Sequence, residues 1–93
     1  MIAGFAGRET EKVWNGEGSR RLPGNIQAVA RRKLRMLDAA VRLDVLRQPP
    51  GNRLETLRGK RKGQHSIRIN DQWRVCFRWV AGTAHDVESV DYH

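Results

Sequence analysis

Apolar and polar residues alternate along residues 67–79, which is the pattern of two half-buried β-strands. The apolar positions are Ile67, Ile69, Trp73, Val75, Phe77 and Trp79. Three turn-forming residues at 70–72 separate the two runs. A three-residue loop keeps the apolar residues on one face and sets Arg68 against Arg74, whereas a two-residue loop mixes both faces. The pattern therefore predicts an antiparallel hairpin in the first of these registers.

The predicted register has an electrostatic consequence on the polar face of the hairpin. Arg68 and Arg74 become direct neighbours, and Arg78 lies farther along the same face. Directly opposed residues have Cβ atoms about 5 Å apart, where like charges destabilise the pair. Two interpretations stay open: the guanidiniums hold an anion such as phosphate between them, or they splay apart into water.

A helical period replaces the alternation between residues 25 and 46. One apolar stripe runs at steps of three and four through Ile26, Ala30, Leu34, Leu37, Val41 and Val45. Lys33 falls within this stripe, where it must extend to the surface or point into a cleft. A shorter helix is predicted to begin at a capping Thr10 and to end after Trp14. A DNA-reading helix needs a second short helix set against it at a tight turn, and the loop at residues 18–24 does not resemble such a turn. The basic side of the long helix therefore indicates a solvated face.

Further strands are expected at residues 1–5, 54–57 and 86–92, so the expected order is β-α-α-β-β-β-β. This order predicts an α+β fold, a small and mostly antiparallel sheet with helices packed on one face. The 93 residues suffice for one modest core, and we expect a single domain over residues 1–93.

The net charge points to a polyanionic partner. Lysine and arginine outnumber the acidic residues 18 to 10, a net charge of +8. Nucleic acid is the first expectation for such a chain, and an anionic membrane surface is the second. No apolar run approaches the roughly 20 residues of a spanning helix, and the single cysteine and three histidines show no metal-ligand spacing. We therefore expect a cytoplasmic protein without metal or cofactor and without membrane attachment.

An ordered set of residues resembles the RelE superfamily of toxins, and within it the HigB branch. The set is Glu55, Leu57, Arg58 and Gly59, then Gly63, Ser66, Arg68 and Ile69, then Trp73, Arg74 and Phe77, and finally Asp91, Tyr92 and His93. The resemblance covers essentially the whole chain and implies a RelE-like fold. It also implies the toxin of a type II toxin–antitoxin system, a metal-independent endoribonuclease that cleaves messenger RNA on the ribosome and so inhibits translation and growth. The implied partners are messenger RNA, the ribosome with its ribosomal RNA, and a helix-turn-helix antitoxin of the HigA type, through which the complex binds operator DNA.

The resemblance also implies roles for individual residues. The implied catalytic set is Glu55, Arg58, Arg68, Arg74, Tyr92 and His93. Glu55 stands where some members carry the general base and some HigB proteins carry histidine, the arginines embrace the phosphate, and Tyr92 and His93 supply acid–base and positioning groups. A second set is expected to contact RNA: Lys60, Arg61, Lys62, Asn70, Arg78 and Asp91.

A non-catalytic module that binds RNA or the ribosome is the alternative, because positive charge favours any phosphate backbone. A DNA-binding regulator also fits the charge but lacks tandem helices. The carboxylate of Glu55 beside a pair of arginines favours catalysis, since binding alone needs no carboxylate next to phosphate.

Overall fold

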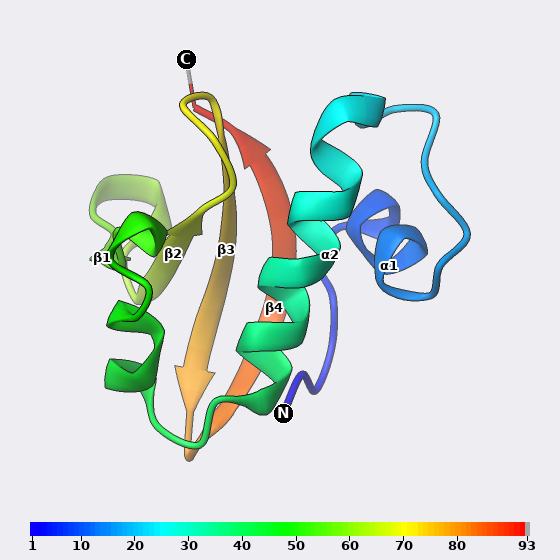
Figure 1. Ribbon diagram of the computed structural model, residues 1–93. Helices are drawn as coiled ribbons and strands as arrows, with labels where there is room; N and C mark the ends of the chain where they lie inside the picture. Colours follow the sequence, from blue (N-terminus) through cyan, green and yellow to red (C-terminus); the bar gives the residue numbers. More distant parts are fainter. Residues whose placement is uncertain (93) are drawn as a thin grey trace.

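The computed structural model describes residues 1–92 and contains a four-stranded antiparallel sheet with two helices on one face (Figure 1). The strands are β1 (Glu55–Thr56), β2 (Gln64–Arg68), β3 (Trp73–Val80) and β4 (Thr83–Asp91), in the spatial order β1-β2-β3-β4. The α-helices are α1 (Arg8–Trp14) and α2 (Gly24–Ala39), and three short 3₁₀ helices follow: η1 (Leu43–Arg47), η2 (Pro50–Asn52) and η3 (Gly59–Arg61). The predicted α+β class is confirmed.

The β2–β3 hairpin has the predicted register. Arg68 pairs with Arg74, and Ile67 pairs with Val75. The Asn70 carboxamide builds the turn, because its Oδ1 accepts from the backbone N–H groups of residues 72 and 73 at 2.9 and 2.8 Å. A side chain that bonds the backbone two and three residues ahead is the usual device of such turns.

The core lies between α2 and the sheet. The α2 stripe buries Ile26, Ala30, Leu34 and Leu37, each at most 2% exposed. They belong to the same buried cluster as Ile67, Val75 and Phe77 of the sheet, and Trp73 and Trp79 pack against it with part of their surface exposed. The apolar face of the predicted hairpin is therefore the face that packs against α2.

The predicted helix over residues 25–46 is too long. α2 ends at Ala39, Ala40 is extended, and Val41 is 74% exposed. The carbonyl of Val41 lies beside Gly82 in the β3–β4 turn, so the helix has reached the end of the sheet and a further turn would cover nothing. The chain reverses there and buries Leu46 from η1 instead.

Two predictions for the N-terminal segment are also wrong in detail. Residues 1–5 make two isolated parallel bridges to β4, Ile2 to Ala84 and Phe5 to Val87, rather than a continuous strand. Thr10 does not cap α1, which begins after Gly7. Its buried hydroxyl instead accepts a hydrogen bond from the Ser89 N–H at 2.7 Å and so ties α1 to β4.

A register shift in β4 directs the C-terminal end of the chain. Cys76 pairs with Glu88 but Arg78 pairs with His85, and Asp86 between them has a φ of 52°. Such a bulge bends its strand and re-aims the residues that follow. After it, Val90 pairs with Arg74, and the end of β4 lies beside the β2–β3 turn (Figure 1). No helix in residues 1–92 is long and apolar enough to cross a bilayer.

Candidate active site

A cavity of about 310 Å³ opens on the sheet face opposite the helices. Its lining residues are Arg53, Glu55, Arg68, Asn70, Asp71, Arg74 and Tyr92. They come from the residue after η2, from β1, from both sides of the β2–β3 hairpin and its turn, and from the end of β4. Antiparallel pairing brings these segments together, since Ser66 of β2 pairs with both Glu55 of β1 and Cys76 of β3.

Arg74 is the best-fixed cation of the cavity. It is 8% exposed, and its Nε donates to the Ser66 hydroxyl at 2.7 Å. Its Nη2 donates to the Arg53 carbonyl at 2.5 Å, and its Nη1 lies 3.9 Å from Glu55 Oε1. Two neutral acceptors therefore hold the guanidinium by one side, while its third nitrogen lies toward the Glu55 carboxylate.

Arg68 lies opposite Arg74 and has its own acidic partner. Its Nη2 donates to the carboxylate of Asp71, which is almost fully exposed. Arg68 and Arg74 thus each bond to different protein groups. The sequence suggests instead a shared anion between them or guanidiniums that splay apart into water. Because a side chain as exposed as that of Asp71 can rotate away at little cost, Arg68 remains able to bind an external anion.

Glu55 supplies a carboxylate to the cavity, in addition to that of Asp71. Its side chain is 55% exposed, so solvent and a ligand can both reach it. The pairing of Glu55 with Ser66 fixes its backbone on β1, and β2 lies between it and Arg74 on β3. The carboxylate and the guanidinium therefore face one space from either side of β2.

Tyr92 closes the cavity at the end of β4. Its N–H donates to the Gln72 carbonyl at 2.5 Å, and its hydroxyl lies 3.7 Å from the Sγ of Cys76. Tyr92 is 39% exposed, and its partial burial, followed by the hydrogen bond to Cys76, raises the pKa of the phenol above its usual value. The phenol is therefore protonated at neutral pH, where it can donate a proton or a hydrogen bond but cannot act as a base.

Cys76 is a packed thiol within β3. It is fully buried, and burial raises the pKa of its thiol. A protonated, inaccessible thiol is not a nucleophile.

The remaining members of the predicted catalytic and RNA-contacting sets lie elsewhere. Arg58, Lys60, Lys62 and Arg78 are exposed and do not line this cavity. Arg58 follows β1, and the two lysines lie in and beside η3. His93 lies outside the described residues.

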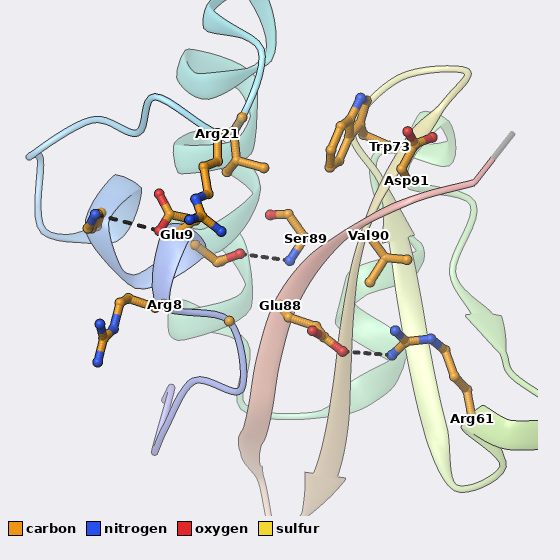
Figure 2. Close-up of a pocket in the computed structure, with 13 residues that line it drawn as sticks. Arg8, Glu9, Arg21, Arg61, Trp73, Glu88, Ser89, Val90 and Asp91 are labelled. Atoms are coloured by element: carbon orange, nitrogen blue, oxygen red, sulfur yellow. Dashed lines mark hydrogen bonds and ion pairs between the residues drawn. The ribbon is translucent and has the colours of Figure 1, made fainter.

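Two other residues of the RNA-contacting set lie along a second, larger cleft of about 750 Å³ beside β4 (Figure 2). Figure 2 shows Asp91 next to Trp73 at one end of this cleft and the ion pair of Arg61 with Glu88, 2.9 Å long, at the other. Asp91 also accepts a hydrogen bond from the Gln72 side chain at 3.0 Å. Arg61 is thus engaged with a carboxylate, whereas the two neighbouring lysines project into solvent.

Three residues of the site were not assigned a role from the sequence. Ser66 belongs to the motif that carries the resemblance, but nothing in the pattern shows that its hydroxyl meets Arg74. Asp71 carried only a turn signal, and its spacing of three from Arg68 was the available hint. Arg53 gave no signal, because its contribution is a backbone carbonyl.

The cavity combines guanidiniums, two carboxylates and a protonated phenol in one exposed space. Such a set can bind a phosphate, accept a proton and donate one. Within residues 1–92, no group of three or more histidine, cysteine, aspartate or glutamate side chains is placed to hold a metal ion.

Comparison with known proteins gives consistent similarities. The family described as the RelE-like toxin of type II toxin–antitoxin system HigB matches residues 4–93. Toxin HigB-1 of Vibrio cholerae is 44% identical over 85 residues, which cover 90% of this chain and 90% of that protein. Endoribonuclease HigB of Proteus vulgaris is 31% identical over 61 residues, 66% of this chain and 65% of that protein. An uncharacterized protein of Haemophilus influenzae is 38% identical over 64 residues, 69% of this chain and 63% of that protein.

Proposed function

Because the chain belongs to the HigB family of RelE-like toxins in type II toxin–antitoxin systems, we propose that it is an endoribonuclease that cleaves messenger RNA on the ribosome. The observation that carries this proposal is the cavity in which Arg74, Arg68 and Glu55 face one space. The name of the Proteus vulgaris relative supports the same activity. Cleavage of messenger RNA would stop translation and growth, the effect expected of a toxin.

The proposed reaction uses the 2′-hydroxyl of the RNA as nucleophile. Glu55 accepts the 2′-hydroxyl proton as the 2′-oxygen attacks the adjacent phosphorus, and the bond from phosphorus to the 5′-oxygen breaks. The leaving 5′-oxygen takes up a proton, so the products carry a 2′,3′-cyclic phosphate and a 5′-hydroxyl. No metal is needed for this step, because the nucleophile is already placed beside the phosphate.

The arginines stabilise the charge that develops on the phosphate. Arg74 is held in place through Nε and Nη2 before substrate arrives, so its remaining nitrogen needs little reorganisation. Arg68 exchanges Asp71 for a phosphate oxygen, and Arg58 approaches from outside the cavity.

The last two residues, Tyr92 and His93, are proposed to supply the proton for the leaving 5′-oxygen. His93 is the proposed general acid, since an imidazole with a pKa near 6.5 can donate at neutral pH. The protonated phenol of Tyr92 orients the phosphate or shares that role.

A toxin of this type has an antitoxin partner. We propose a helix-turn-helix protein of the HigA type that also binds operator DNA. The toxin itself would act in the cytoplasm, where Lys60, Lys62, Arg78 and Asn70 would contact messenger RNA or ribosomal RNA. The exposed positive charge at the two lysines supports this surface.

The testing experiment maps messenger RNA 5′ ends after incubation with translating ribosomes. Glu55→Gln is expected to slow cleavage by about 10²- to 10⁴-fold, the usual contribution of a general base. Glu11→Gln, which removes an exposed carboxylate on α1, is the matched control and should cleave at the wild-type rate. His93→Gln should slow cleavage over the same range while ribosome association is retained.

Tight ribosome binding by the wild-type protein with every messenger RNA intact would refute the endoribonuclease. The non-catalytic binding module would then take its place.

A further inference from the structure

Lys33 is a buried cation within the apolar stripe of α2. It is 9% exposed, and burial, with the positive charges of Arg32 and Arg68, lowers the pKa of its ammonium group. Burial of a charge is costly unless hydrogen bonds compensate it. The Nζ of Lys33 donates to Asn52 Oδ1 at 2.5 Å. This bond ties α2 to the segment that precedes β1.

Asn52 organises that segment from a fully buried position. Its Nδ2 donates to the carbonyls of Leu46 and Gln48, each at 3.2 Å. Its backbone N–H donates to the Pro49 carbonyl at 2.9 Å. One carboxamide therefore joins η1, the residues around η2 and, through Lys33, the long helix.

The next residue, Arg53, connects this network to the cavity. Its φ of 44° lies in the left-handed region, which a residue with a Cβ adopts only where its surroundings fix it. The carbonyl of Arg53 accepts the hydrogen bond from Arg74 Nη2 at 2.5 Å. The backbone that Asn52 holds in place therefore includes the Arg53 carbonyl, which is the acceptor that orients Arg74.

We propose that Lys33 and Asn52 are positioning residues for Arg74. They fix the backbone at Arg53, whose carbonyl keeps the guanidinium aimed at the reacting phosphate, although neither side chain lines the cavity. The inference rests on the proposed ribonuclease function. Misorientation of a catalytic group impairs the transition state more than substrate binding, so the network should act on kcat.

The test is Lys33→Met, which keeps the bulk of the side chain and removes the bond to Asn52. We expect kcat for ribosome-dependent cleavage to fall roughly tenfold to hundredfold. The Kd for an uncleavable 2′-O-methyl RNA should change less than twofold. In NMR spectra, hydrogen exchange at the Arg74 Nη–H groups, assigned by comparison with Arg74→Lys, should accelerate because Nη2 loses its fixed acceptor at the Arg53 carbonyl.

Arg32→Met is the matched control, since it removes one positive charge from the adjacent, exposed position of the same helix. Wild-type kcat and wild-type exchange at Arg74 are expected for it. An equal loss of kcat in Arg32→Met would overturn the proposal in favour of a charge effect.

Unchanged exchange at Arg74 in Lys33→Met would also overturn the proposal, whatever happens to the rate. If Lys33→Met does not fold, Lys33→Gln, which keeps a polar head, is measured in its place with the same expectations. Failure of the wild-type protein to cleave RNA would refute the proposed function instead, and the exchange measurement would still decide whether Lys33 positions Arg74.

Discussion

Ser66→Ala is expected to destabilise the fold by about 1.5–3 kcal/mol, the usual worth of a hydrogen bond to a charged group. Ser66 is fully buried, and its hydroxyl accepts from Arg74 Nε at 2.7 Å. The substitution removes one oxygen atom and almost no apolar contact area. The expected cost therefore arises from a buried guanidinium nitrogen that loses its acceptor.

Urea unfolding measures this cost as a lower midpoint at an unchanged m-value. Thermal unfolding should show a Tm lower by roughly 10 °C, given the enthalpy and entropy of a domain of this size. The double-mutant cycle with Arg74→Met isolates the pair, because Ser66→Ala should cost little once the guanidinium is absent.

A loss below about 0.5 kcal/mol, within the usual range of surface substitutions, would refute the reasoning. The same loss in both backgrounds would also refute it, because the cost would then be independent of Arg74.

Three further predictions follow from the structure. Phe77→Ala should cost about 3–5 kcal/mol in urea unfolding, and Trp73→Ala should cost clearly less because part of the ring is exposed; equal losses would contradict the assigned burial. Tyr92 is the single tyrosine, so absorbance at 295 nm follows its ionisation alone. In the native protein it should ionise above its ordinary pKa, whereas in urea it should ionise near pH 10. Since the native state holds this proton more tightly, stability should fall as the pH rises from the ordinary to the raised pKa. A native midpoint at or below about 10 would contradict the partial desolvation of the phenol. Replacement of Lys60 and Lys62 by Ala should weaken RNA binding and flatten its salt dependence, because fewer counterions are released; an unchanged slope would remove this loop from the RNA surface.

The strand pattern was sufficient to predict the central hairpin. Alternation determines the register because only one pairing keeps Ile67 and Val75 on the same face, and the structure has that pairing. The end of α2 could not be predicted, because the apolar stripe continues to Val45 while the sheet that it covers ends at the β3–β4 turn. The length of α2 is set by the extent of the sheet beneath it, which the periodicity of the sequence does not show.

The sequence predicts several of the charged and aromatic side chains in the candidate site. The register predicts that Arg68 and Arg74 are neighbours, and the family resemblance adds Glu55 and Tyr92, which line the same cavity. The acceptors that hold Arg74 are a small hydroxyl and a backbone carbonyl, and neither has a distinctive sequence signal. The Ser66 hydroxyl is placed by the pairing of β2 with its neighbours. The Arg53 carbonyl follows Asn52, whose hydrogen bonds hold this backbone but which the sequence shows only as one polar residue in a turn.

The most direct test of the account uses a messenger RNA with a single 2′-deoxy nucleotide at the mapped cleavage position, presented on translating ribosomes. The account predicts that this RNA remains intact, whereas the all-ribose RNA is cleaved to a 2′,3′-cyclic phosphate and a 5′-hydroxyl, because the 2′-oxygen is the nucleophile. Cleavage of the deoxy-substituted RNA at the same position, or products with 5′-phosphate ends, would contradict the central claim that Glu55 and Arg74 promote attack by the RNA on its own phosphate.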